Sequence, residues 1–233
     1  MMKQKSVRER SSDMIEKKVV KAIIENKFPV DSSLPSERDL ANDFGVGRPT
    51  VREALQRLCR DGWIEMKRGQ SAIVNDYWRK GNLTTLENII QHHDAVPDEF
   101  VVYLLELRLL LAPSYTREAV TINQAKVIAM LAHLDEVEDD PESYARFDWD
   151  IQKGLVRLTS NPVYLLIMNS FDSFYINMAT KYFDSESNRK FTAEYYENLL
   201  KAVLQGDSTQ TERIVRDTME QSIILWNQKS RRE

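Results

Sequence analysis

Apolar side chains in the first third of the chain recur at the spacing of amphipathic helices, interrupted by short polar corners. Between residues 14 and 23 an apolar residue returns every three or four positions, which predicts a helix. Ser11 or Ser12 can cap its beginning, and the polar corner PVDSSLP follows its end. The chain therefore begins its pattern with one helix of about three turns.

A second and a third helix are predicted on either side of a glycine-containing corner. Ser36 followed by Asp39 resembles a capping box with the shorter acid, which predicts a helix from Glu37 to about Asp43. Gly45 and Gly47 break that helix. The sequence then continues as GVGRPTVR, in which two glycines, a proline and two arginines crowd into eight residues.

The third helix is predicted to begin in this corner and to end before Gly62. Pro49 suits its first turn, because the missing N–H of proline costs no hydrogen bond there. Its apolar stripe consists of Val51, Leu55, Leu58 and Cys59. We expect Cys59, the one cysteine of the chain, to be a small buried apolar residue.

Two short runs of strand character, WIEMK and SAIVN, follow and are separated by RGQ, which predicts a hairpin. Three helices and a hairpin, with the second and third helices joined by a tight turn, are typical of a winged helix-turn-helix. We therefore predict a winged helix-turn-helix domain over residues 1–74 and a linker over residues 75–82, where apolar periodicity lapses.

Beyond residue 82 strand signals are absent and the protein is predicted to be mainly α. Helical stretches are LTTLENIIQ, FVVYLLELRLLL, AKVIAMLAHLDEV, YARFDWDIQKGLVRL, VYLLIMNSFDSFYINMATKYF, YYENLLKAVL and ERIVRDTMEQSIILW. Breakers lie between them at Pro97, Pro141, Pro162 and Gly206. The pattern predicts an all-α antiparallel bundle of about seven helices over residues 83–233.

Charge separates the two regions, although the whole chain has a net charge of −4. Residues 1–80 carry a net charge of +5 and residues 81–233 a net charge of −9, which favours contact of the first region with a polyanion. The chain has no apolar run of membrane-spanning length, and its start, MMKQKSVRERSSD, lacks the apolar core of a signal peptide. We expect a cytoplasmic protein.

The corner GVGRPTVR places arginines at the beginning of the predicted third helix. Arg48 and Arg52 are four residues apart and share one exposed face with Thr50. A helix N-terminus favours anions, and the fork of arginine fits a phosphate or the edge of guanine. Arg38 on the second helix, and Lys67 with Arg68 at the tip of the hairpin, extend this basic surface. The shared explanation is that the third helix docks in the major groove of duplex DNA.

The stretch LPSERDLANDFGVGRPTVREALQRLCRDGWIEMKRGQ closely resembles the DNA-binding domain of the GntR family of bacterial transcription regulators. The helical second half resembles the FadR branch of that family, in LLELR, FDWDIQKGLVRLTSNPVY and SIILW among other stretches. The resemblance implies a homodimer on a palindromic operator, with Arg68 and Gly69 approaching the minor groove. Gly47 and Pro49 stand where resembled regulators have threonines, so two hydroxyl donors to phosphate are absent.

Many members of the branch hold a metal ion with one Asp and three His residues, and this chain departs from that pattern. Asp148 is followed by Gln152 at the position expected for the first His, and glutamine is a poor ligand. The chain contains only His92, His93 and His133, and the adjacent pair cannot face one point together. We predict no metal site, no catalytic residues and no cofactor.

An apolar effector is the alternative to a metal. Along one predicted helix a stripe repeats at Phe171, Tyr175, Met178 and Tyr182. Ser222 and Trp226 share a face of the last helix, and Arg108 interrupts an otherwise apolar helix, so it needs a polar partner if it is buried. Such stripes are usually core, and this reading stays open beside that of a ligand cavity.

Resemblance to the fatty-acid-responsive members of the branch implies that the effector is a long-chain acyl-CoA. The acyl chain would lie among the aromatic residues, and the implied effector-binding residues are Arg108, Tyr175, Tyr182, Arg216, Ser222 and Trp226, with Arg216 near a CoA phosphate. Met219 replaces a glycine of the resembled regulators, which affects chain length or pose. A small carboxylate is the second interpretation of the effector. An enzyme acting on CoA thioesters is a third, but no nucleophile and base can be nominated for it.

Overall fold

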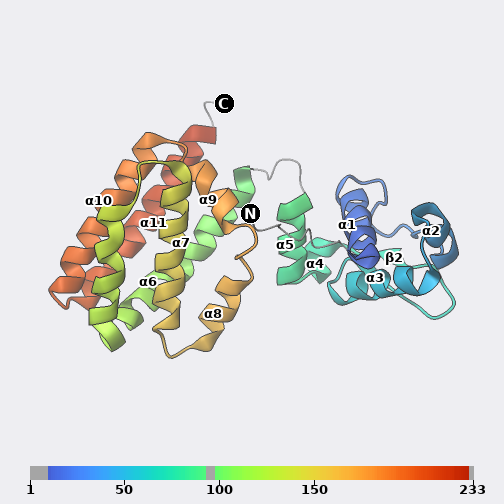
Figure 1. Ribbon diagram of the computed structural model, residues 1–233, viewed down its shortest axis with the longest axis horizontal. Coiled ribbons are helices and arrows are strands. Elements are labelled where there is room, and N and C mark those ends of the chain that lie inside the picture. The colour runs from blue at the N-terminus through green and yellow to red at the C-terminus, as the bar shows by residue number, and fades with distance from the viewer. Residues whose placement is uncertain (1–9, 93–97, 231–233) are drawn as a thin grey trace, which may run out of the picture. The chain divides into compact units, whose positions relative to one another are not determined.

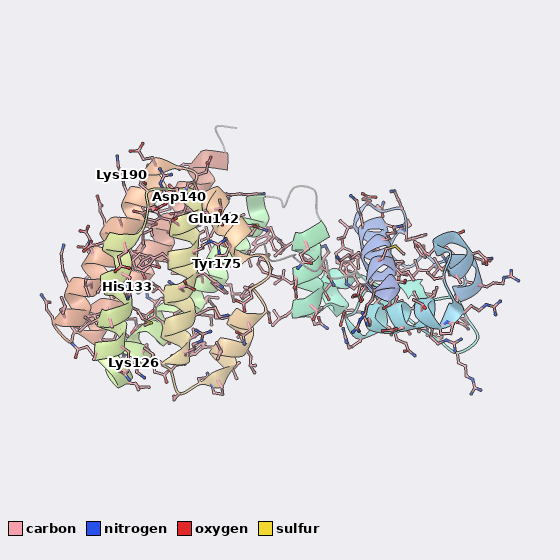
Figure 2. All side chains as sticks on the ribbon, viewed as in Figure 1. Lys126, His133, Asp140, Glu142, Tyr175 and Lys190 are labelled. Carbon is pink, nitrogen blue, oxygen red and sulfur yellow. The ribbon has the colours of Figure 1, made fainter. Side chains whose placement is uncertain are left out.

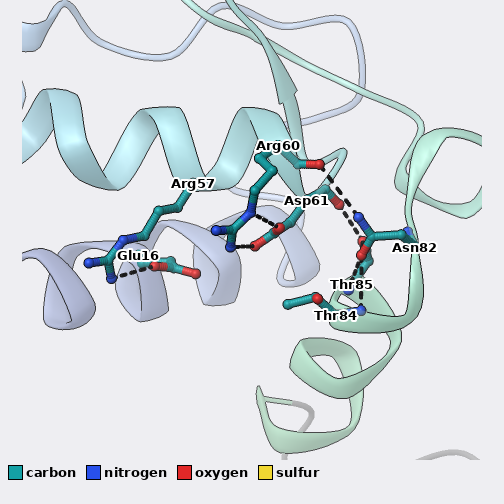
Figure 3. Close-up of polar contacts among 7 residues, drawn as sticks. All are labelled: Glu16, Arg57, Arg60, Asp61, Asn82, Thr84 and Thr85. Atoms are coloured by element: carbon teal, nitrogen blue, oxygen red, sulfur yellow. Dashed lines mark hydrogen bonds and ion pairs between the residues drawn. The ribbon is translucent and has the colours of Figure 1, made fainter. Parts of the chain in front are cut away.

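The computed structural model describes residues 10–92 and 98–230, and the chain divides into two compact units, Met1–Ala95 and Val96–Glu233 (Figure 1). The helices of the first unit that precede the wing are α1 (Ser11–Ile24), α2 (Glu37–Phe44) and α3 (Arg48–Arg60). Arg57 of α3 binds α1 through ion pairs with Asp13 at 2.6 Å and Glu16 at 3.6 Å (Figure 3 shows the second).

The predicted serine cap of α1 is wrong. The N-cap residue is Arg10, whose backbone carbonyl accepts from the N–H groups of Asp13 and Met14, and no side chain caps the helix. Ser12 lies inside the first turn and is buried. Both serines are therefore helical residues, one and two positions past the N-cap.

The corner between α2 and α3 follows the sequence prediction. The backbone N–H of Asp39 donates to Ser36 Oγ at 3.2 Å, and the Ser36 hydroxyl donates back to the Asp39 carboxylate at 2.5 Å. Gly45 ends α2 with φ of 63°, a left-handed conformation that glycine adopts without strain. Gly47 is the N-cap of α3, and Pro49 lies in its first turn.

The buried face of α3 consists of Val51, Ala54, Leu55 and Leu58. Cys59, which we expected in this stripe and buried, is exposed. The reason is angular: the stripe recurs at i, i+3, i+4 and i+7 from Val51, and position 59 lies about 100° past its last member. The prediction of a buried cysteine is therefore wrong.

The hairpin forms strands β1 (Ile64–Glu65) and β2 (Ile73–Val74), which pair antiparallel and are shorter than predicted. Gly69 lies in the connecting turn with φ of 78°. The corner PVDSSLP pairs with β2 as well, through a bridge between Ser33 and Ile73 and a bond from the N–H of Leu34 to the Ala72 carbonyl at 2.8 Å. The segment PVDSSLP is too short and too polar for an alternation of apolar and polar residues to indicate a strand there.

Two further helices, α4 (Tyr77–Lys80) and α5 (Leu83–His92), belong to the first unit. Ile89 of α5 is buried in the core that α1 and α3 build, whereas the sequence suggested that this segment begins the helical bundle. Two hydrogen bonds join the start of α5 to the end of α3 (Figure 3). Asn82 Nδ2 donates to the carbonyl of Arg60, the last residue of α3, at 3.5 Å, and the Thr85 hydroxyl donates to the carbonyl of Asp61, which follows it. The N-terminal end of α5 is thus hydrogen-bonded to the C-terminal end of α3.

The second unit contains α6 (Asp98–Leu131), the 3-10 turn η1 (Ala132–Glu136), α7 (Pro141–Arg157), α8 (Pro162–Asn169), α9 (Tyr175–Phe183), α10 (Glu186–Leu204) and α11 (Ser208–Ser230). Helix α6 packs against α7, α10 and α11, and α10 also packs against α11 (Figure 1). Pro141 and Pro162 each begin a helix, and Gly206 follows α10, as predicted; Pro97 lies outside the described residues.

Two boundaries in this unit differ from the sequence prediction. The second and third predicted helices are joined in α6, which includes Pro113 and is kinked at Asn123 with φ of −149° and ψ of 62°. The long stretch from 163 to 183 is instead divided into α8 and α9 by a turn at 171–174. Among the described helices, none combines the length and apolar character needed to cross a membrane.

Candidate DNA-binding surface and effector cavity

The N-terminus of α3 is an exposed, basic helix end. Its N-cap is Gly47, which supplies no side-chain cap, and Arg48 is the first residue of the helix. Arg48 is exposed and Thr50 is half-buried. Backbone N–H groups at such an end and the helix dipole favour an anion, so this helix end is suited to a phosphate, and the predicted contact with DNA stays a prediction.

Arg52 is exposed one turn further along α3, where it pairs with Glu37 of α2. Its Nε donates to one carboxylate oxygen at 3.0 Å and its Nη2 to the other at 2.7 Å. The hydrogen bond from Arg52, with the charges of Arg52 and Arg48, lowers the pKa of Glu37 below its usual value. The structure therefore pairs Arg52 with a carboxylate on α2.

The other predicted DNA-binding residues lie on the surface of the same unit. Arg38 approaches its neighbour Asp39 at 3.5 Å, and Lys67 pairs with Glu65 at 3.2 Å. Arg68 and Gly69 are exposed in the turn of the wing. In the described part of the chain, the side chains of Arg38, Lys67 and Arg68 share no hydrogen bond or ion pair with α3.

The second unit contains a cavity of about 110 Å³ between α6, α7, α9 and α11. Most of its wall is apolar and includes Leu104, Leu105, Leu107, Leu111, Phe171, Phe174 and Met178. Met219 of α11 also lines it and is 4% exposed. The residues of the predicted stripe at 171, 175, 178 and 182 all line this cavity, although Phe171 lies in the turn before α9 and not on the helix.

A charged pair at the wall of the cavity explains the arginine in an apolar helix. Arg108 of α6 donates to Asp148 of α7 through Nη2 at 2.7 Å and Nη1 at 2.9 Å. Nη1 also donates to the hydroxyl of Tyr175 at 2.8 Å, and this hydroxyl and that of Tyr196 donate to Asp148. The Nε of Arg108 is buried and has no hydrogen-bond partner among the described residues.

Burial and charge set the protonation of this cluster. Burial raises the pKa of Asp148, but the charge of Arg108 and the hydrogen bonds to the carboxylate outweigh it, so the pKa lies below its ordinary value. Burial likewise lowers the pKa of Arg108, and the charge of Asp148 raises it well above the ordinary value. Burial raises the pKa of Tyr175 and Tyr196 well above 10. At neutral pH the pair is ionised and both tyrosines are neutral donors.

A second layer holds this cluster in place. Gln152 donates to the hydroxyl of Tyr196 at 3.3 Å and accepts from that of Tyr115. Trp149 stacks on Tyr175 with 4.0 Å between ring centroids and an interplanar angle of 19°. Sequence reasoning missed Tyr115, Trp149 and Tyr196, and it considered Asp148 only as a metal ligand. The available signal was Asp148 on the apolar face of α7, which matches Arg108 in the apolar stretch LLELRLLL of α6.

The remaining predicted effector residues are distributed unevenly. Tyr182 and Ser222 line the cavity, and the tyrosine hydroxyl donates to Ser222 Oγ at 3.4 Å. Trp226 is buried beside Tyr182, with 6.3 Å between their ring centroids, but it does not line the cavity. Arg216 is exposed on α11 and pairs with Glu212 at 3.2 Å. The structure thus groups Arg108, Tyr175, Tyr182 and Ser222 at the cavity and leaves Arg216 on the surface.

The donor set at Asp148 does not fit a metal. Both carboxylate oxygens are already bound by Arg108, whose positive charge occupies the position a cation would need. His133 is exposed on η1, and its Nδ1 lies 3.2 Å from a carboxylate oxygen of Glu136 (His133 is labelled in Figure 2). His93 and the side chain of His92 lie outside the described residues. Within the described residues no group of three potential ligands gathers.

The winged helix with a basic helix end, followed by a separate helical unit, is the architecture of a DNA-binding regulator with a second domain. Residues 11–74 match the bacterial regulatory proteins of the gntR family, and residues 75–232 match the FadR C-terminal domain. The chain belongs to the GntR family of bacterial regulatory proteins and carries a FadR C-terminal domain. It is a transcription regulator and not an enzyme. The two matches meet between residues 74 and 75, whereas the compact units divide between Ala95 and Val96.

Relatives extend over most of the chain. The fatty acid metabolism regulator protein of Shewanella pealeana is 37% identical over 91% of this chain and 88% of its own length. That of Klebsiella pneumoniae is 34% identical over 91% of this chain and 89% of its own. The solved structure of Lar, which controls the expression of the Listeria monocytogenes agr system, covers 97% of this chain and 99% of its own with a TM-score of 0.62. Its sequence identity is 17%, so it supports the fold alone.

Proposed function

We propose that this protein is a homodimeric regulator of fatty acid metabolism. Binding of a long-chain acyl-CoA in the second unit modulates its operator binding, by causing the protein to release the operator DNA. The observation that carries the effector assignment is an apolar cavity lined by Arg108, whose buried Nε–H has no partner in the described part of the chain. An apolar chain fits the wall, and a thioester or amide oxygen is the acceptor this donor lacks. The names of the relatives support the link to fatty acid metabolism.

DNA binding is assigned to the first unit. Arg48 and Arg52 of α3 would meet the major groove, with Arg38 and Thr50 on the flanking phosphates. Lys67, Arg68 and Gly69 of the wing would approach the neighbouring backbone and minor groove. A two-fold dimer requires a palindromic operator, because two identical recognition helices read two identical half-sites.

The cavity must widen to accept this ligand. Its volume of about 110 Å³ is below the roughly 300 Å³ at which pockets for drug-sized ligands begin. We expect α8 to be the part of the wall that moves, because Met168 of α8 lines the cavity and no residue of this helix is buried. For release of DNA, the widened state must favour a dimer that no longer matches the operator, typically by about 1 to 3 kcal/mol.

Titration calorimetry with palmitoyl-CoA tests the effector assignment, with free CoA and acetate as comparison ligands. We expect binding of palmitoyl-CoA with a negative heat-capacity change, because apolar surface is buried, and much weaker binding of free CoA. Absence of palmitoyl-CoA binding would contradict the assignment. Arg108→Met should weaken binding, whereas Arg117→Met, on the exposed side of the same helix, should leave it unchanged.

A small carboxylate is the second candidate, and the volume of the cavity favours it. A cavity of this size matches a ligand near the size of benzene better than an acyl chain. Against it, Asp148 already neutralises Arg108, so a second carboxylate would compete with a buried partner. Mass spectrometry of the protein purified under native conditions separates the two, because a retained acyl-CoA is heavy and a small acid is light.

A further inference from the structure

We propose that Glu37 is a specificity-determining residue. It positions Arg52 to contact a base, and its negative charge disfavours the contact of Arg52 with a DNA phosphate. The inference rests on the proposed binding of DNA by α3. It concerns an acidic residue inside a basic surface, and its physical grounds are the geometry of one ion pair and the location of the carboxylate.

The ion pair leaves the reading edge of Arg52 open. A guanidinium has five N–H groups, and Glu37 accepts from Nε and from one N–H of Nη2. Of the three N–H groups that remain, two point along the Nη1–Nη2 edge and are parallel to each other. A guanine presents O6 and N7 to such a pair of donors in the major groove. Glu37 therefore fixes the orientation of Arg52 without consuming the edge that recognises guanine.

The carboxylate is itself held in place. Glu37 is the first residue of α2, immediately after the capping residue Ser36, and its side chain is only 26% exposed. A negative charge in the first turn of a helix is stabilised by the helix dipole. Arg52, by contrast, is 61% exposed and would sample many rotamers alone. The pair orders this long side chain before DNA arrives, which lowers the entropy cost of the specific contact.

The same carboxylate opposes non-specific binding. A phosphate that draws Arg52 away leaves the Glu37 charge facing a polyanion, and like charges brought together cost free energy. When Arg52 instead contacts a base edge in the groove, its bond to Glu37 persists. The pair therefore weakens binding to arbitrary DNA more than it weakens binding to the operator.

The test compares Glu37→Gln with Asp43→Asn, which removes the same charge from an exposed position of α2 that has no ion pair to α3 among the described residues. The probes are duplexes selected from a random pool by the wild-type protein and shuffled versions of them. In Glu37→Gln we expect about two- to fivefold weaker binding of the selected duplex, the scale of a lost surface ion pair. Binding of the shuffled duplex should be about two- to fivefold tighter at 50 mM salt.

A double-mutant cycle with Arg52→Ala separates positioning from a general charge effect. If Glu37 acts through Arg52, Glu37→Gln causes no further loss of selected-duplex binding in the Arg52→Ala background. Equal changes for selected and shuffled duplexes, as expected for Asp43→Asn, would overturn the inference while leaving DNA binding intact. Failure of the wild-type protein to select any duplex would overturn the proposed function and this inference together.

Discussion

The two units each contain an arginine bound by both oxygens of a carboxylate, in opposite surroundings. Arg52 and Glu37 have side chains that are 61% and 26% exposed, whereas Arg108 and Asp148 are 18% and 3% exposed. An exposed pair contributes at most about 1 kcal/mol and can change partners. A buried pair cannot separate without leaving a charge in a poorly polar site. The first pair therefore suits a surface that exchanges contacts with DNA, and the second suits a fixed wall.

The edges of the two guanidinium groups differ as well. Arg52 binds its carboxylate through Nε and Nη2, and Arg108 through Nη1 and Nη2. Arg52 consequently keeps its terminal edge open, whereas Nε is the nitrogen of Arg108 that has no partner among the described residues. The terminal edge fits the two acceptors of a guanine, whereas a single N–H fits one carbonyl oxygen. Each geometry thus agrees with the ligand proposed for its unit.

The largest effect is expected on breaking the buried pair. Asp148→Asn leaves the Arg108 charge uncompensated, so the free energy of unfolding should fall by about 3 to 5 kcal/mol in chemical denaturation. Asp150→Asn, at an exposed position of the same helix, should change it by less than about 0.5 kcal/mol. Replacing both partners, with Arg108→Met and Asp148→Leu, should recover most of the loss. If Asp148→Asn changed the free energy of unfolding as little as Asp150→Asn does, the distinction between the buried and the exposed pair would be lost.

The corresponding change in the first unit should affect binding and not stability. Arg48→Ala and Arg52→Ala should each weaken binding to a selected duplex by about 1 to 3 kcal/mol if the side chain reads guanine. Unfolding temperatures should stay near that of the wild type, because both side chains are exposed. Arg213→Ala on α11 is the matched control. Wild-type affinity of both variants would show that a different face of the first unit meets DNA.

The buried cluster also predicts a pH dependence that the exposed pair lacks. The pKa values of Tyr175 and Tyr196 are raised in the fold, so their contribution is complete below the unfolded value near 10 and is lost as pH rises above it. Stability should fall by about 1.4 kcal/mol per pH unit for each tyrosine. Tyr196→Phe should reduce this slope, and Tyr103→Phe, at an exposed position, should not. An unchanged slope in Tyr196→Phe would contradict burial as the cause.

The smallest effect concerns the corner that orients the exposed pair. Ser36→Ala removes the side-chain cap of α2, so the free energy of unfolding should fall by about 1 kcal/mol. Ser11→Ala should have a smaller effect, because Ser11 caps no helix in the structure. Equal losses in the two variants would show that the cap of α2 contributes no more than an ordinary surface serine.

The same contrast explains which features the sequence could predict. The α2–α3 corner depends on neighbours within a few residues, so capping, glycine and proline rules located Ser36, Gly45 and Pro49 correctly. The buried cluster joins residues as far apart as Arg108, Asp148 and Tyr196, and no local pattern encodes such a contact. Sequence reasoning therefore found Arg108 and Tyr175, but it missed Tyr196 and the pairing of Arg108 with Asp148.

Boundaries failed where tertiary packing overrides local signals. The apolar stretch from 163 to 183 reads as one helix, but a turn at 171–174 interrupts it, where Asp172 accepts from Trp149 at 3.0 Å and from Lys153 at 2.6 Å. Helix α5 packs with the first unit because Ile89 enters its core. The exposure of Cys59 depends on the rotation of α3 against α1. Each of these depends on contacts that a one-dimensional pattern does not contain.

The account as a whole is tested most directly by titrating palmitoyl-CoA into the complex of the wild-type protein with a fluorescent duplex that it has selected. We predict that the anisotropy falls as the duplex is released, with a shift of the apparent affinity of about 5- to 150-fold. Arg108→Met should require more palmitoyl-CoA for the same release, and free CoA should release none. Unchanged operator affinity at saturating palmitoyl-CoA would contradict the effector assignment while leaving DNA binding in place.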